Sequence, residues 1–124
     1  MLEDIFLDGT DMLPSVTFMR EGSLRIEGRI IPGTTEVFFR PLIDWIRKLT
    51  CNKVILDVDI EYLSSDACIH LYKLLRTLND NLVIQHIITF WHYELNDEEH
   101  YELGKIMAEK LDRIKFFFKG HAKD

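Results

Sequence analysis

The chain has 124 residues, of which 15 are Lys or Arg and 21 are Asp or Glu, so its formal net charge at pH 7 is −6. This acidic balance disfavours binding to nucleic acid or anionic lipid, and we expect protein partners instead. No apolar run approaches the roughly 18 residues of a membrane-spanning helix, and the acidic N-terminus lacks the basic segment of a secretory signal. We therefore expect one cytoplasmic domain over residues 1–124, without membrane insertion.

The first elements predict a β-hairpin. Ser15 to Met19 and Ser23 to Gly28 flank a turn in which Gly22 supplies conformational freedom. In the second of these segments apolar residues alternate with charged ones, which is typical of a half-buried strand.

A helix is predicted after Pro32-Gly33, which interrupts regular structure. Apolar residues then recur at spacings of three and four and give one helical face: Phe38, Leu42, Trp45, Ile46 and Leu49. Proline inside a helix removes a hydrogen bond, so either Pro41 bends this helix or the regular helix begins nearer Phe39 or Arg40.

The second half of the chain alternates predicted strands and helices. These are a strand over Val54 to Ile60, a helix over Ser65 to Leu78, a β-rich run over Ile84 to Trp91, a helix opened by Asn96 as cap with Glu99 in a capping box, and a strand over Lys115 to Phe118. The order β-β-α-β-α-β-α-β predicts an α/β fold with a small mixed, mostly parallel sheet and helices packed on one face.

The junction between the clearest strand and its helix is the first candidate site. Tyr62 and Leu63 lead into Ser64 and Ser65, and a helix N-terminus has free N–H groups and a partial positive charge. Either serine can cap the helix, and the same position suits a phosphate. Two interpretations stay open: Ser65 is a simple N-cap, or it is a phosphorylation switch.

The order of elements and this junction resemble STAS domains, which have the anti-anti-sigma fold. The chain is more similar to the SiaC family of bacterial regulatory phosphoproteins, and the similarity extends over roughly residues 5 to 118. It is carried by the blocks Gly22–Pro32, Phe39–Ile46 and Trp91–Glu98, in which Pro-Leu-Ile-Asp-Trp and Trp-His-Tyr-Glu are the more specific runs. Pro41 belongs to the second block.

The resemblance implies a non-enzymatic protein that works by partner switching. Its unphosphorylated form would bind and activate a diguanylate cyclase, and a serine/threonine kinase and a PP2C-type phosphatase would set its phosphorylation state. Ser65 aligns with the family's phosphorylated threonine, with Ser64 as runner-up. The implied partner surface consists of Tyr62, Leu63, Ser64, Ser65 and Asp66 with the exposed side of the following helix. Some nearby carboxylates are expected close to Ser65, where they would oppose a second anion: Asp57, Asp59, Glu61 and Asp66.

A departure from the family pattern keeps an alternative open. Asp66 and Ala67 stand where the family has serines. Asp66 would then supply a constant negative charge in a degenerate STAS-like binding module, or an anti-sigma-factor antagonist, that is not regulated by phosphorylation.

An enzyme is the third alternative, with Asp57 and Asp59 holding a divalent metal. Two carboxylates without a third ligand are a weak signal, and the five histidines lack metal-binding spacing, so no metal and no cofactor are expected. His92 is expected to be a structural residue at a strand end. Cys51 and Cys68 are expected to be reduced, partly buried thiols.

Overall fold

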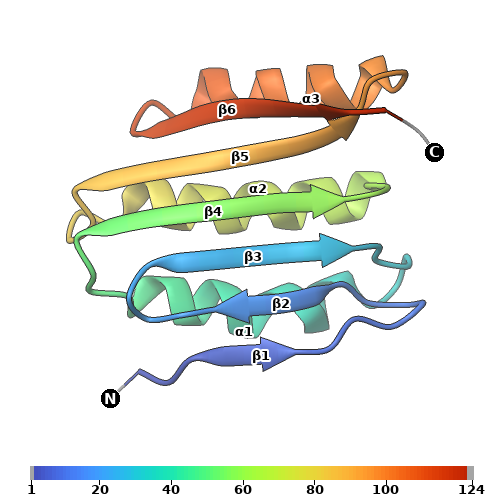
Figure 1. Ribbon diagram of the computed structural model, residues 1–124. Helices are drawn as coiled ribbons and strands as arrows, with labels where there is room; N and C mark the ends of the chain where they lie inside the picture. Colours follow the sequence, from blue (N-terminus) through green and yellow to red (C-terminus); the bar gives the residue numbers. More distant parts are fainter. Residues whose placement is uncertain (1, 123–124) are drawn as a thin grey trace.

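Residues 2–122, which the structure describes, form a six-stranded sheet with three helices in this computed structural model (Figure 1). The elements in chain order are β1 (Ile5–Leu7), β2 (Ser15–Phe18), β3 (Ser23–Gly28), α1 (Thr35–Arg47), β4 (Lys53–Ile60), α2 (Ser65–Asp80), β5 (His86–Glu94), α3 (Glu98–Lys110) and β6 (Ile114–His121). The strands lie side by side in the order of the sequence.

The direction of the strands brings the starts of all three helices to one end of the sheet. β1 and β2, and β2 and β3, pair antiparallel, whereas β3 to β6 are parallel neighbours. Consequently β3, β4 and β5 all finish at the right of Figure 1, where α1, α2 and α3 begin. We call this the C-terminal end of the sheet. Ligands of α/β proteins commonly bind at this end.

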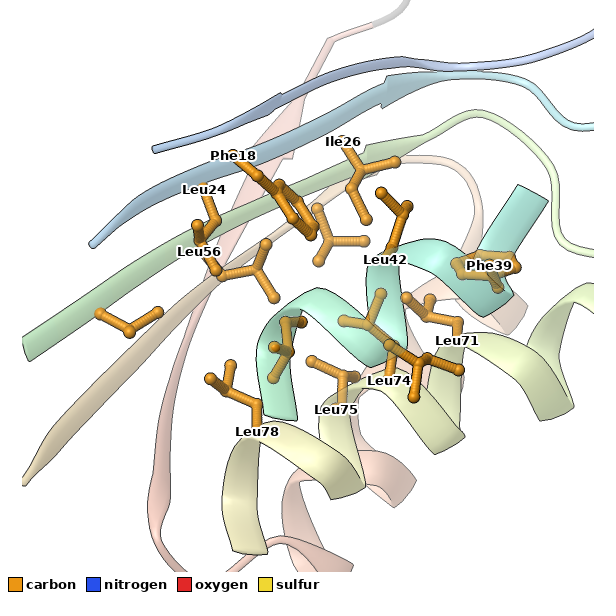
Figure 2. Close-up of a cluster of buried hydrophobic side chains, with 14 of the residues drawn as sticks. Phe18, Leu24, Ile26, Phe39, Leu42, Leu56, Leu71, Leu74, Leu75 and Leu78 are labelled. Atoms are coloured by element: carbon orange, nitrogen blue, oxygen red, sulfur yellow. The ribbon is translucent and has the colours of Figure 1, made fainter. Parts of the chain in front are cut away.

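All three helices cover the same face of the sheet, so the predicted α/β architecture is confirmed. On β4, Val54, Leu56, Val58 and Ile60 are buried, and the residues between them are half-buried on the uncovered face. Figure 2 shows how leucines of α2 meet α1 and the strands in one core, in which Leu71, Leu74, Leu75 and Leu78 have no exposed surface. Each such side chain contributes about 1.5–3 kcal/mol by leaving water.

The third helix packs unusually close to the sheet. Trp91 on β5 is fully buried, and its indole Nε1–H donates to the carbonyl oxygen of His100 at 3.1 Å. A Cβ atom at Gly104 would lie 2.7 Å from that same Nε1. Glycine at this position is therefore what allows α3 to lie against the indole ring, which places His100 and the start of α3 beside the end of β4.

The structure adds one strand to the predicted order. β1 pairs with β2 through only three residues, and two of them, Phe6 and Leu7, are exposed. A strand this short shows no alternation in the sequence. It is held from outside the strand, where the Trp45 indole Nε1–H donates to the carbonyl oxygen of Glu3 at 2.6 Å.

Of the two alternatives for Pro41, the late start of the first helix is wrong. α1 begins at Thr35 and continues through Pro41. The N–H that proline lacks would have bonded the carbonyl of Val37. Pro41 is exposed and Val37 is 80 % exposed, so the missing bond lies on the solvent side, where water can satisfy the free carbonyl.

The remaining boundaries differ by a few residues. α2 continues to Asp80, β5 is shifted to His86–Glu94, and β6 extends to His121. The predicted cap of α3 is wrong, because Asp97 rather than Asn96 precedes the helix and its Oδ1 accepts the N–H of His100 at 3.0 Å. No helix within residues 2–122 is long and apolar enough to cross a bilayer.

Candidate functional site

The loop between β4 and α2 brings the predicted acceptor to the C-terminal end of the sheet. β4 ends at the buried Ile60, and the N–H of Glu61 donates to the carbonyl oxygen of Gly28 at 2.8 Å. The chain then turns at Ser64, whose extended backbone precedes the helix. Ser64 Oγ accepts the N–H of Ala67 at 3.1 Å, so Ser64 is the N-cap. The interpretation of Ser65 as the cap is therefore wrong.

Ser65 is the first residue of α2 and has a free hydroxyl. Its side chain is exposed and makes no hydrogen bond within residues 2–122. The two serines therefore differ: Ser64 Oγ is half-buried and engaged, whereas Ser65 Oγ points to solvent at the positive end of a 16-residue helix.

Removal of the Ser64 hydroxyl is expected to cost about 1 kcal/mol, because it leaves the Ala67 N–H without its cap. Ser64→Ala should lower the free energy of unfolding in urea by that amount, and the matched variant Ser65→Ala should leave it within about 0.5 kcal/mol of the parent. Equal losses in the two variants would contradict the assignment of the cap.

The carboxylates predicted to surround Ser65 are divided between two places. Asp66 contacts His70 at 3.5 Å, and Glu61 pairs with Arg29 at 3.2 Å. Asp57 and Asp59 instead lie on the uncovered face of the sheet, where both contact Arg25, at 3.8 and 3.7 Å. A phosphate on Ser65 would thus have two carboxylates nearby in the chain, and one of them, Glu61, is already paired with Arg29.

A hollow of about 290 Å³ separates the loop before α2 from the start of α3. Tyr62, Ser64 and Ser65 line one side of it, and Glu99, His100 and Leu103 line the other. The hollow is open to solvent beside the Ser65 hydroxyl, so an incoming protein segment can reach both elements.

Exposed apolar side chains accompany Ser65 at the C-terminal end of the sheet. Tyr62 is 64 % exposed and was part of the predicted surface, along with the half-buried Leu63 and the exposed Asp66. Ile69 is 55 % exposed and lies on the exposed side of α2, which the predicted surface included. Val37 at the start of α1 is 80 % exposed and was missed, although it falls off the apolar stripe of its helix. Single exposed apolar residues are common, but several at one end suit a protein interface.

His100 connects this hollow to the core. Its ring stacks on Trp91 at a centroid distance of 5.0 Å, and its Nε2 is buried without a hydrogen-bond partner among the described residues. Burial lowers the pKa of His100 from its ordinary value.

This burial predicts a loss of stability in acid. Below the ordinary histidine pKa of about 6.5, His100 binds a proton in the unfolded chain but stays neutral in the folded protein. The free energy of unfolding therefore falls as the pH drops from that value toward the lower pKa of the folded state. Urea unfolding between pH 8 and pH 5 should show a smaller fall in His100→Gln than in the parent. The matched variant at an exposed histidine, His86→Gln, should keep the parental fall; the same fall in all three would contradict the prediction.

The alternative sites assemble less completely. Asp57 and Asp59 share Arg25, and no group of three or more metal-binding side chains within residues 2–122 is arranged to hold an ion. Cys51 and Cys68 are free and half-buried, and burial raises the pKa of both thiols, which keeps them protonated near neutral pH. His92 does lie at a strand end, but it contacts Asp57 and His121.

Comparison with known proteins identifies structures of the same fold and a family. No curated protein sequence matches the chain significantly. Among solved structures, SiaC of Pseudomonas aeruginosa superposes with a TM-score of 0.83 at 21 % identity, covering 95 % of this chain and 98 % of that one. A chain in the crystal structure of diguanylate cyclase SiaD in complex with its activator SiaC, from the same organism, gives a TM-score of 0.83 at 22 % identity, with 95 % and 100 % coverage.

Apo-SiaC from the same organism gives a TM-score of 0.75 at 18 % identity, with 94 % and 98 % coverage. These structures share the fold. The family model of SiaC family regulatory phosphoproteins matches residues 7–120, nearly the whole chain, and so this protein belongs to the SiaC family.

Proposed function

We propose that this protein is a non-enzymatic, cytoplasmic regulator that binds a diguanylate cyclase when unphosphorylated and releases it when Ser65 is phosphorylated. Membership of a family of regulatory phosphoproteins supports the general role. The cyclase is proposed because the related SiaC is described as the activator of SiaD and forms a complex with it.

The observation that carries the proposal is the difference between the two serines. Ser64 Oγ is half-buried and accepts a backbone N–H of α2, so a kinase would have to break that hydrogen bond to reach it. Ser65 Oγ is exposed and makes no hydrogen bond within residues 2–122. A kinase can therefore modify Ser65 without first unfolding the start of the helix, which supports Ser65 as the proposed acceptor with Ser64 as the runner-up.

The free protein can tolerate the phosphate, whereas a complex that buries Ser65 cannot. Phosphorylation adds about −1.5 to −2 charges, and a helix N-terminus stabilises an exposed anion by roughly 0.3–1 kcal/mol. Burial of the same anion without a compensating cation costs several kcal/mol. A partner that covers Tyr62, Leu63 and Asp66 together with the serines would be released by this difference.

We propose that a serine/threonine kinase adds the phosphate to Ser65 and that a PP2C-type phosphatase removes it. Both need an exposed acceptor within a segment that they can reach from solvent. Ser65 is exposed, and the loop 61–64 before it can be reached from solvent, because Glu61 and Tyr62 are exposed and Leu63 is half-buried.

The proposal is tested by intact-mass measurement and phosphopeptide mapping of the protein purified from its native host. The expected result is one phosphate on Ser65, retained in Ser64→Ala and absent from Ser65→Ala. A protein that is never modified yet still binds its partner would contradict the switch. That result would favour a degenerate binding module, or an anti-sigma-factor antagonist, with Asp66 as a constant charge.

A further inference from the structure

A carboxylate and two imidazoles form a continuous chain of hydrogen bonds on the uncovered face of the sheet. Asp57 lies on β4, His92 on β5 and His121 at the end of β6. His92 Nε2 is 2.9 Å from Asp57 Oδ1, and His92 Nδ1 is 2.8 Å from His121 Nε2. The two rings are within 7° of parallel, and the His92 side chain is 14 % exposed. These side chains link three parallel strands that are also paired through their backbones.

The carboxylate fixes where the protons of this chain lie. Asp57 can only accept, so His92 Nε2 carries a hydrogen. In the neutral pair, His92 Nδ1 accepts the Nε2–H of His121. When one proton is added, either ring can carry the charge, and one hydrogen still lies between the rings. When two are added, both facing nitrogens carry hydrogen, and neither can accept at 2.8 Å.

We propose that Asp57, His92 and His121 form a proton-dependent clasp. The clasp holds the end of β6 against β5 while the two imidazoles share at most one added proton, and it opens when both are charged. A backbone hydrogen bond also depends on the position of His121, because the N–H of Leu95 donates to the carbonyl oxygen of His121 at 2.9 Å. Opening would also widen a hollow of about 530 Å³ that His92 and His121 line.

Several charged groups lie around the clasp. Asp57 is shared with Arg25 on β3, Glu94 is the register partner of His121, and Lys119 that of His92. The other titratable groups facing the clasp and its hollow are Glu27 on β3, Asp59 at the end of β4, Glu61 in the following loop, and Asp97 and His100 at the start of α3. If both imidazoles carry a charge, the two rings in contact repel each other.

The clasp is independent of the proposed phosphorylation, and its test needs neither partner nor kinase. In uniformly ¹⁵N-labelled protein at pH 8, we expect a scalar coupling across the hydrogen bond between His92 Nδ1 and His121 Nε2. Acidification until both rings are charged, as their ¹⁵N shifts report, should abolish the coupling. The protection factor of the Leu95 amide should fall about tenfold in the same step, the value of one lost hydrogen bond.

Two variants separate the clasp from general acid effects. His121→Ala should lower the protection of the Leu95 amide about tenfold already at pH 8, whereas His86→Ala, at the opposite end of β5, should not. The Gln85 amide, which donates to Asn52 at 2.8 Å far from the clasp, serves as the internal reference. The absence of any coupling at pH 8, or Leu95 protection that does not fall when both rings are charged, would overturn the proposal.

Discussion

Ser65→Glu is expected to weaken binding to the proposed diguanylate cyclase partner by about 100-fold, or ~3 kcal/mol, because in the proposed complex a carboxylate at the first residue of α2 becomes buried against the partner. Ser65→Ala should bind within about twofold of the parent, since the free Ser65 hydroxyl has no partner to lose within residues 2–122. Isothermal titration of the purified cyclase against each variant measures the difference.

A control must separate the effect of where the new charge lies from the effect of the changed net charge. Gln85→Glu adds the same charge at an exposed position at the opposite end of the sheet from Ser65, and it should leave binding unchanged. Equal affinity for Ser65→Glu and the parent would show that the partner does not bury Ser65. Equal weakening in Gln85→Glu would show that net charge alone, rather than the start of α2, determines binding.

The second large effect concerns stability. Gly22→Ala is expected to lower the free energy of unfolding by about 3 kcal/mol or more. Gly22 has a φ of 123°, and a Cβ there would lie 2.0 Å from the carbonyl oxygen of Lys53. That carbonyl cannot move freely, because Lys53 is the first residue of β4. Two residues further along β4, the Ile55 N–H donates to the Gly22 carbonyl oxygen at 2.9 Å and fixes the two segments together. Relief of the clash would therefore separate the hairpin from β4.

Gly33→Ala is the matched control for this variant. Gly33 also has a positive φ, 94°, but a Cβ there would meet nothing within 4 Å. It should cost only the backbone strain of about 1–2 kcal/mol, so the difference between the two variants in urea unfolding isolates the clash. Equal losses would mean that the strands rearrange around the added methyl group of Gly22→Ala without penalty.

Local patterns were enough to predict most of the fold. Alternation along Val54 to Ile60 and the stripe of Leu71, Leu75 and Leu78 identify β4 and α2 because burial repeats with the period of the element. β1 escaped prediction because its pairing with β2 and the anchoring of Glu3 by Trp45 are contacts between distant residues. Such contacts leave no periodic trace in the sequence.

The candidate site was predictable in position but not in detail. The strand-to-helix junction and the resemblance to the SiaC family lead to Ser65, yet the choice of Ser64 as cap depends on backbone angles that two adjacent serines do not reveal. The separation of Asp57 and Asp59 from Ser65 follows from the pleat, which turns them to the uncovered face toward Arg25. The contact between His92 and His121 joins residues 29 apart and required the register of β5 and β6.

The most direct test of the proposed switch is a binding titration with protein that carries phosphoserine at position 65, introduced during synthesis, beside the unphosphorylated protein. We expect the unphosphorylated form to bind the diguanylate cyclase and the phosphorylated form to bind at least about 100-fold more weakly. Treatment of the phosphorylated form with a PP2C-type phosphatase should restore binding. Equal affinity of the two forms would contradict the account, because the phosphate would then lie outside the interface.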